Sequence, residues 1–268
     1  MTSPDREERR EGTAPVAVIS GGAGGLGRAL AAALLARGWR VAVIDRDVSA
    51  LVPASGLSLY TCDLTEPEAL SRTCARVLAD HGRADLVIYN AGITQIGPFA
   101  ELDAATHRKV FEVNYFAAMA MAGHFLQALR DTGGTHLAIS SVAGFTPLLN
   151  RCAYAASKHA LEGAFKSLRS EERAYGVRVQ IAAPSFVATN IGRPERETSG
   201  IARPGSAADG MDYMTPEAAA AEILRGLARG RPMIPVGRVA RLAWWVNRLS
   251  PSLFQRLMER SVSGQPDP

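Results

Sequence analysis

Short hydrophobic runs alternate with longer amphipathic segments along the chain of 268 residues. The short runs are rich in Val, Ile and Leu and are mostly bounded by Gly, Asp or Pro, as expected for buried strands. They lie near residues 15–20, 40–45, 57–62, 84–90, 135–140 and 177–183, with a shorter run at 231–236. The longer segments have helical spacing, and they lie at 26–38, 67–81, 103–130, 152–174 and after Pro216.

The predicted strands are continuously hydrophobic, which is typical of a parallel sheet covered by helices on both faces. We therefore predict one α/β domain over residues 14–236, with a doubly wound sheet of about seven strands. Residues 1–13 are highly charged and predict a disordered tail. Residues 190–214 are rich in Gly, Pro and Ser and follow the carboxyl end of a strand, so we expect them to form a substrate loop or lid.

A basic amphipathic extension is predicted at residues 237–268, after the last strand. Its hydrophobic positions have helical spacing, and they are Leu242, Trp245, Val246 and Leu249, then Leu253, Phe254, Leu257 and Met258. Arginines and Asn247 occupy much of the other face. Two interpretations stay open: packing on the protein, as a lid over an apolar pocket or in a subunit interface, and contact with a membrane surface. Both favour an apolar substrate.

Composition and charge exclude several classes of function. The formal net charge of +4 is too small to indicate a nucleic-acid partner. No apolar run approaches the roughly 18 residues that span a bilayer, and the charged first residues lack the apolar segment of a signal peptide. The three cysteines and five histidines show no metal-ligand spacing, so we expect no metal, reduced thiols and a cytoplasmic protein.

A glycine-rich turn, Ser20–Gly27, lies between the first predicted strand and the first predicted helix. Glycines let the backbone approach a pyrophosphate, and a helix N-terminus favours its negative charge. Asp45 ends the second strand, at the spacing expected for a carboxylate that binds the adenosine ribose. Because that carboxylate repels a 2′-phosphate, NAD is the preferred cofactor, whereas the adjacent Arg46 leaves NADP open.

Tyr154 and Lys158 lie four positions apart at the start of a predicted helix, and so on one helix face. On its own this pair fits a solvated helix face. Because a dinucleotide loop precedes it in the chain, the pair also fits a catalytic phenol. The ammonium would lower the pKa of this phenol, which would then transfer protons at neutral pH.

These motifs, in this order, resemble the short-chain dehydrogenases/reductases of the single-domain type over about residues 14–236. The resemblance implies a Rossmann-type fold and a catalytic tetrad of Asn114, Ser141, Tyr154 and Lys158. Ser141 is preferred to Ser140 because it lies thirteen residues before Tyr154. The cofactor-binding positions that match are Ser20, Gly21, Gly25, Leu26, Gly27, Asp45, Arg46, Asp63, Leu64, Asn90, Ala91, Gly92, Tyr154, Lys158, Pro184, Val187 and Thr189.

The resemblance implies an oxidoreductase that interconverts a secondary alcohol and a ketone with NAD or NADP. Tyr154 would be the general acid/base, Lys158 would tune it and reach the nicotinamide ribose, Ser141 would hold the substrate oxygen, and Asn114 would anchor a water. A homodimer or homotetramer is implied as well. The alternatives are a non-catalytic dinucleotide sensor, a membrane-surface protein on the same fold, and a sugar epimerase or dehydratase.

Overall fold

A computed structural model describes residues 14–189, 201–202 and 213–262. Within these residues seven strands form one sheet, in the order β3-β2-β1-β4-β6-β7-β9, and every neighbouring pair is parallel. The strands are β1 (Val16–Ser20), β2 (Arg40–Asp45), β3 (Leu57–Thr61), β4 (Leu86–Tyr89), β6 (Thr135–Ile139), β7 (Arg178–Pro184) and β9 (Met233–Val236). The order reverses between β1 and β4, which confirms the doubly wound sheet predicted from the sequence.

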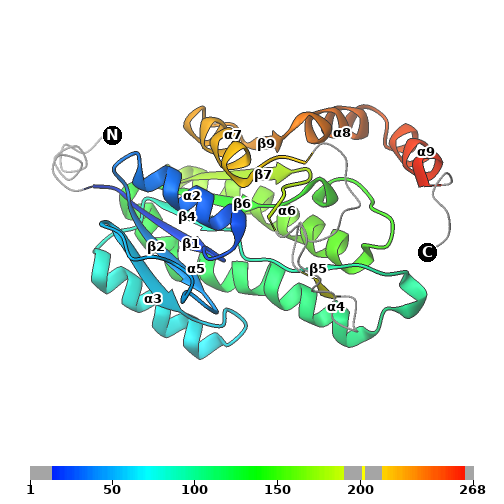
Figure 1. Cartoon of the computed structure of the whole chain (residues 1–268). Helices are drawn as coiled ribbons and strands as arrows, with labels where there is room; N and C mark the ends of the chain where they lie inside the picture. The colour runs from blue at the N-terminus through cyan, green and yellow to red at the C-terminus, as the bar shows by residue number, and fades with distance from the viewer. Residues whose placement is uncertain (1–13, 190–200, 203–212, 263–268) are drawn as a thin grey trace.

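Helices cover both faces of the sheet (Figure 1). One face packs against α2 (Gly25–Leu35) and α7 (Pro216–Ala228), and the other against α3 (Pro67–His81), α5 (Ala117–Thr132) and α6 (Cys152–Glu172). Each face has its own hydrophobic core. This arrangement explains why strands such as β1 and β4 are buried along their whole length and show no polar alternation.

The predicted helix at 103–130 differs in detail from the observed one. It consists of α4 (Ala104–Phe111), a π-helical turn η2 (Glu112–Phe116), and α5. A π turn inserts an extra residue into the helix and often marks a functional site. Helical periodicity does not reveal this turn, because the hydrophobic spacing continues through it.

Two short strands lie outside the sequence prediction. β5 (Thr94–Gln95) pairs antiparallel with β8 (Ile201–Ala202), and both are buried. β8 belongs to the predicted loop 190–214, so part of that loop returns to the body of the protein beside the end of β4. Residues 190–200 and 203–212 of this loop, and the predicted tail 1–13, lie outside the described residues.

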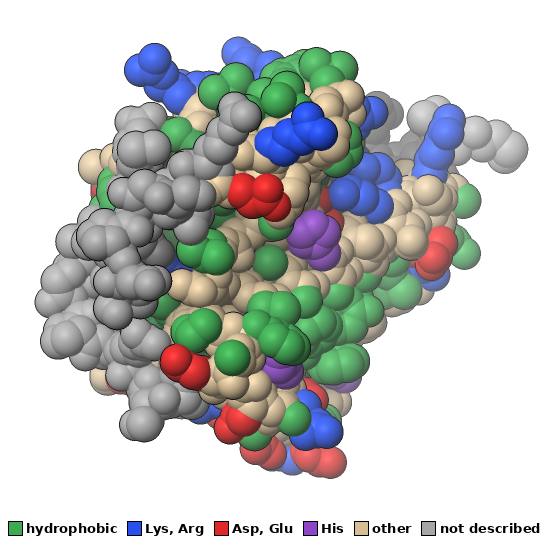
Figure 2. All heavy atoms as spheres, turned by 90° about the vertical axis from the view of Figure 1, so that its right-hand side faces the viewer, with side chains coloured by type: hydrophobic (Ala, Val, Ile, Leu, Met, Phe, Trp, Pro, Cys, Tyr) green, Lys and Arg blue, Asp and Glu red, His purple; other side chains and the backbone are tan. Residues whose placement is uncertain are grey.

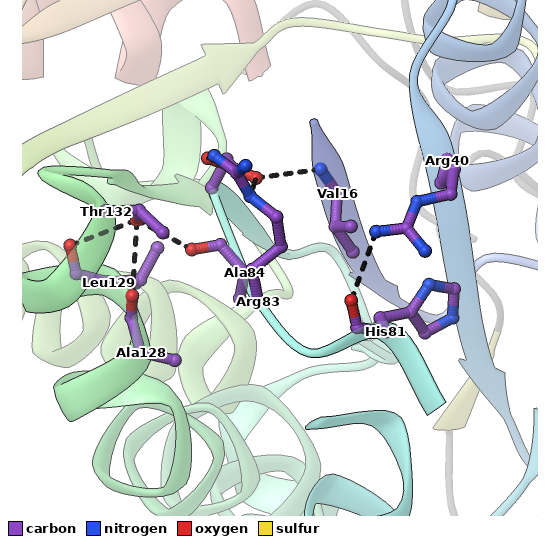
Figure 3. A network of polar contacts seen from close by, with 9 residues as sticks. Val16, Arg40, His81, Arg83, Ala84, Ala128, Leu129 and Thr132 are labelled. Carbon is purple, nitrogen blue, oxygen red and sulfur yellow. Dashed lines mark hydrogen bonds and ion pairs between the residues drawn. The ribbon is translucent and has the colours of Figure 1, made fainter. Parts of the chain in front are cut away.

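A polar network joins elements at the amino end of the sheet (Figure 3). Asp85 accepts hydrogen bonds from the Val16 amide at 2.8 Å and from Arg83 Nε at 2.8 Å. Thr132 Oγ1 donates to the Ala84 carbonyl at 2.8 Å, and Arg40 donates to the His81 carbonyl at 3.1 Å. These bonds connect β1, β2, β4, α3 and α5 at the edge opposite the strands' carboxyl ends.

Two further helices, α8 (Arg238–Leu249) and α9 (Pro251–Val262), follow β9 and confirm the predicted amphipathic extension as helical. Of the two interpretations left open by the sequence, packing of the whole hydrophobic stripe on the body of this chain does not fit the exposures on α8. Ala240 and Ala243 are buried, and Asn247 Nδ2 donates to the Phe145 carbonyl at 2.6 Å, whereas Leu242, Trp245 and Leu249 are exposed. No helix within the described residues has the length and hydrophobicity to cross a membrane.

Candidate active site

Three separate segments bring the four predicted tetrad residues to the carboxyl end of the sheet. Ser141 follows β6 and caps the short 3-10 helix η3 (Val142–Gly144), with its Oγ accepting from the Ala143 amide at 3.2 Å. Tyr154 and Lys158 lie in the first two turns of α6. Asn114 is buried in the π turn η2. The strands run from left to right in Figure 1, so Figure 2, seen from the right, looks onto this end of the sheet.

Lys158 is buried, and its Nζ donates to the Ile139 carbonyl at 2.9 Å. Burial lowers the pKa of Lys158 to about 8, against an opposing effect of the nearby Glu162 carboxylate. Its Nζ lies 5.9 Å from the centre of the Tyr154 ring. The ammonium is therefore fixed beside the phenol by main-chain contact with β6.

The pKa of Tyr154 is raised, mainly because the phenol is buried. The net direction is opposite to the lowering predicted from Lys158, because desolvation of the phenol outweighs the influences that lower its pKa. A hydrogen bond with Ser141 and the positive charge of Arg151 act in the opposite direction and lower the pKa of Tyr154. Arg151, three residues before Tyr154, was not predicted from the sequence, because a lone arginine before a helix carries no recognisable signal.

Ser140 and Ser141 have different surroundings. Ser140 Oγ donates to Glu162 Oε1 at 2.9 Å, and Glu162 also accepts from Lys166 at 2.7 Å, so the Ser140 hydroxyl is held within α6 contacts. The Ser141 hydroxyl instead lies near enough to Tyr154 to lower the pKa of the phenol, and both residues line the same pocket. This difference supports the choice of Ser141 as the substrate-facing serine.

Asn114 connects the π turn to two neighbouring segments. Its Nδ2 donates to the Ile93 carbonyl and to Ser157 Oγ, both at 2.9 Å, and its Oδ1 accepts from the Ile93 amide at 2.8 Å. The side chain thus supports the segment after β4 and the helix that carries Tyr154. Ser157 was not predicted, since it stands between two motif residues without a motif role of its own.

The glycine-rich turn between β1 and α2 forms a cradle at which added side chains would collide. Gly21 has φ of 63°, and a Cβ there would lie 2.7 Å from the Ala91 Cα. A Cβ on Gly27 would strike the Gly21 carbonyl oxygen. The N-terminus of α2 has no side-chain cap and no acid in its first turn, so its amides suit a pyrophosphate. The chain therefore fits a dinucleotide here.

Ser20 and Asn90 fix this cradle to the end of β4. Asn90 Nδ2 donates to the Ser20 carbonyl at 3.2 Å and to the Gly21 carbonyl at 2.8 Å, and the Asn90 and Ala91 amides donate to Ser20 Oγ. Gly92 leaves room for Asn114 and Lys158, since a Cβ there would lie 3.3 Å from Asn114 Oδ1 and 3.5 Å from Lys158 Nζ.

The predicted adenosine-side acids lie at the ends of β2 and β3. Asp45 Oδ2 accepts from the Ala23 amide at 2.9 Å, which ties the end of β2 to the glycine-rich turn. Asp63 accepts from the Thr65 amide and hydroxyl, which lower its pKa, with a smaller contribution from Arg46. Arg46 is exposed next to Asp45, and Leu64 packs against the core below.

A pocket of about 200 Å³ opens in front of these elements. It brings together the predicted residues Gly25, Leu26, Gly27, Asn90, Gly92, Ser141, Tyr154, Lys158, Pro184, Val187 and Thr189. The predicted residues outside its lining are Ser20, Gly21, Asp45, Arg46, Asp63, Leu64, Ala91 and Asn114. Within the described residues no cluster of His, Cys, Asp and Glu could hold a metal ion.

Sequence reasoning missed much of the pocket wall. Ile96, Leu148, Phe186 and Tyr213 add hydrophobic surface beside Tyr154. These residues come from loops, where no periodic pattern distinguishes a pocket residue from a solvent-exposed one.

Known proteins share both the sequence and the fold. Residues 15–200 match the short chain dehydrogenase family. A dehydrogenase/reductase SDR family member 7B from Bos taurus is 31% identical over 264 residues, covering 91% of this chain and 80% of that protein. A short chain dehydrogenase from Burkholderia cenocepacia, in complex with NADP, is 25% identical with a TM-score of 0.80, covering 91% of this chain and 97% of that chain.

A third similar protein is an alcohol dehydrogenase from the archaeon Thermococcus sibiricus, complexed with 5-hydroxy-NADP. It is 26% identical with a TM-score of 0.69, covering 81% of this chain and 91% of that chain. The shared sequence over most of the chain, the doubly wound sheet and the glycine-rich cradle lead to one assignment: this protein belongs to the short-chain dehydrogenase/reductase family of nicotinamide-dinucleotide oxidoreductases.

Proposed function

We propose that this protein interconverts an apolar secondary alcohol and the corresponding ketone, with Tyr154 as the general acid/base. The observation that carries the proposal is that one and the same pocket contains Ser141, Tyr154 and Lys158 together with the glycine-rich turn. Such a constellation serves proton transfer at a carbonyl oxygen that faces a bound dinucleotide.

The roles of the side chains follow from their contacts. Ser141 and Tyr154 both line the pocket, so a carbonyl oxygen bound between their hydroxyls would receive two donors while negative charge develops on it. Tyr154 then gives its phenolic proton to that oxygen, and in the reverse direction it takes the proton of the alcohol. Lys158 favours the phenolate by its charge. A bound nicotinamide dinucleotide supplies or accepts the hydride.

The dinucleotide would lie along the glycine-rich turn, with its pyrophosphate at the N-terminus of α2 and its adenosine ribose near Asp45. We propose NAD as the preferred cofactor, because the Asp45 carboxylate repels a 2′-phosphate. Two of the similar structures bind NADP or its 5-hydroxy derivative, and Arg46 could serve such a phosphate. A fluorescence titration with NADH and NADPH decides: tighter NADH supports the proposal, and tighter NADPH overturns it.

The substrate class rests on the lining of the pocket. Ile96, Leu148, Phe186, Val187 and Tyr213 give it a mainly hydrophobic wall. We therefore expect steroid-like, fatty or other lipid-like alcohols and ketones to react with higher kcat/KM than sugars or polyols. Activity confined to sugars or polyols would contradict this substrate class.

The Tyr154→Phe variant tests the catalytic role directly. Removal of the phenolic hydroxyl should lower kcat by about 10²–10⁴-fold, since it removes the acid/base group. Binding of NADH should stay within the range of the wild type, because the ring is kept. A wild-type protein that binds NADH but is inactive on every alcohol and ketone of the panel would favour the dinucleotide sensor instead.

We also propose that the protein forms a homodimer or homotetramer. The support is the family assignment and the exposed Phe116, which directly precedes α5, a helix of 16 residues. Light scattering after size exclusion tests the proposal, and a mass of one chain, 28.5 kDa, would refute it.

A further inference from the structure

An exposed hydrophobic surface lies on the two C-terminal helices. It consists of Leu242, Trp245 and Leu249 of α8, which are 68%, 57% and 79% exposed, and of Leu253 and Leu257 of α9, which are 49% and 48% exposed. We call these five residues the C-terminal apolar surface. It holds half of the large exposed hydrophobic side chains among the described residues, and such a concentration marks an interaction site.

Among the described residues none covers this surface, because the opposite side of the helices makes the contacts with the body. Ala240 and Ala243 are buried, and Asn247 donates to the Phe145 carbonyl at 2.6 Å. On α9 the buried residue is Phe254, which is 8% exposed. The helices are therefore seated on the domain with the C-terminal apolar surface turned outward.

Basic side chains lie on the same two helices as the C-terminal apolar surface. Arg238, Arg241, Arg248 and Arg256 are exposed, and Glu259 is the only acid of the two helices. Glu222 of α7 pairs with Arg241 at 2.5 Å, and the Arg248 guanidinium lies 5.3 Å from the centre of the Trp244 ring. Blue and green side chains lie together along the upper part of the face in Figure 2, the side on which α8 lies in Figure 1.

The charges distinguish between two occupants of the surface. A second copy of this chain, related by a two-fold axis, would bring the same patch against itself and place arginines near arginines. An anionic lipid surface attracts the same arginines and also accepts leucine and tryptophan side chains at its headgroup boundary. Charge complementarity therefore favours the lipid.

We propose that α8 and α9 dock the protein on the surface of an anionic lipid bilayer. The C-terminal apolar surface enters the headgroup boundary, and the arginines lie against lipid phosphates. Because Asn247 bonds the segment that follows Ser141, the docked helices sit beside the pocket. The inference is independent of the proposed enzymatic function, since it rests on a different part of the chain.

Sedimentation of the full-length protein with vesicles tests this inference. We expect sedimentation with phosphatidylcholine vesicles that contain phosphatidylserine, and at least about a tenfold weaker association with phosphatidylcholine alone. The triple variant Leu242→Ser/Trp245→Ser/Leu249→Ser should lose association with both. The matched control Val52→Ser/Phe99→Ser removes exposed hydrophobic side chains elsewhere, 79% and 70% exposed, and should sediment like the wild type.

A charge variant separates the two contributions. Arg238→Gln/Arg248→Gln should weaken binding to the anionic vesicles, whereas the exposed control pair Arg37→Gln/Arg72→Gln should not. Failure of the wild type to sediment, or equal sedimentation of wild type and triple variant, overturns the inference. A lower mass of the triple variant in light scattering without vesicles would assign the surface to a second copy and also overturn it. Oxidoreductase activity is measured separately without lipid.

Discussion

Arg151 does not belong to the predicted tetrad, but its positive charge lowers the pKa of Tyr154. It directly precedes α6, is buried, and lines the pocket with Tyr154. The preceding Asn150 adopts φ of 56°, a left-handed conformation that asparagine tolerates, and its carbonyl accepts from the Gly97 amide at 3.0 Å. This turn fixes where α6 begins, and therefore where Arg151 and Tyr154 lie relative to each other.

We expect the Arg151→Met variant to shift the pH profile of alcohol oxidation. Oxidation needs the phenolate of Tyr154, whose pKa burial raises and Ser141 and Arg151 lower, so the rate should increase with alkaline pH. Loss of the cation removes one lowering influence, and the rise should move to higher pH. Arg151→Lys keeps the charge and should restore the wild-type profile. An unchanged profile in Arg151→Met would show that this charge does not act on the reaction.

A second prediction at the residue scale concerns cofactor choice. The Asp45→Ser variant removes the carboxylate at the end of β2 while keeping a small polar side chain near the Ala23 amide. NADPH binding should tighten relative to NADH by about tenfold or more, because a unit charge no longer opposes the 2′-phosphate. Asp47→Ser, two residues further and exposed, is the control. The ratio of the two dissociation constants is the measurement, and an equal ratio in wild type and Asp45→Ser would refute the role of Asp45.

Individual residues show which features of the site could be predicted from the sequence. Tyr154, Lys158 and Gly27 stand at fixed spacings, so their positions could be predicted. The raised pKa of Tyr154 could not be, because it depends on how the folded chain removes water from the phenol. Arg151 and Ser157 were missed for a similar reason. Arg151 acts on Tyr154 and Ser157 bonds Asn114 only in the folded chain, and no local sequence pattern predicts these contacts.

At the scale of elements, the π turn η2 is the feature that joins three parts of the site. It places Asn114 where one side chain bonds both the amide and the carbonyl of Ile93 and the hydroxyl of Ser157. The segment after β4 and the start of α6 are thereby held at a fixed separation. The sequence predicted a helix here and the role of Asn114 near the site, but not the change of helical geometry.

The Asn114→Ala variant should lower the free energy of unfolding by about 1–3 kcal/mol, because buried polar groups lose their partners. The Ser157 hydroxyl keeps its bond to the Tyr154 carbonyl at 2.8 Å. The amide and carbonyl of Ile93 therefore account for most of the lost hydrogen bonding. Urea unfolding measures the change. Glu112→Ala, exposed in the same π turn, should change it by less than about 0.5 kcal/mol. Similar stability of Asn114→Ala and wild type would contradict the structural role of these bonds.

At the scale of the whole molecule, the residues for catalysis and a group of stabilising hydrogen bonds lie at opposite ends of the strands of one sheet. The pocket lies at the carboxyl ends of the strands, and the network of Asp85, Arg83 and Thr132 lies at the amino ends. The alternation of strands and helices predicted this sheet. It could not predict the network, because Asp85 stands in a short loop and its bond to Val16 spans 69 positions.

A substitution at the amino ends of the strands should therefore change stability, and one at their carboxyl ends should change activity. Asp85→Ala removes the acceptor of the Val16 amide and one partner of the Arg83 guanidinium, and it should destabilise the fold by about 1–3 kcal/mol. The melting temperature should fall by about 2–4 °C per kcal/mol for a chain of this size. At a temperature where both proteins are folded, kcat/KM should match the wild type, whereas Tyr154→Phe should lose activity and keep its melting temperature. Asp131→Ala, an exposed carboxylate near the same edge, is the control for loss of charge. A fall in kcat/KM of folded Asp85→Ala would show that the amino edge also sets the geometry of the pocket, since no contact of Asp85 reaches it directly.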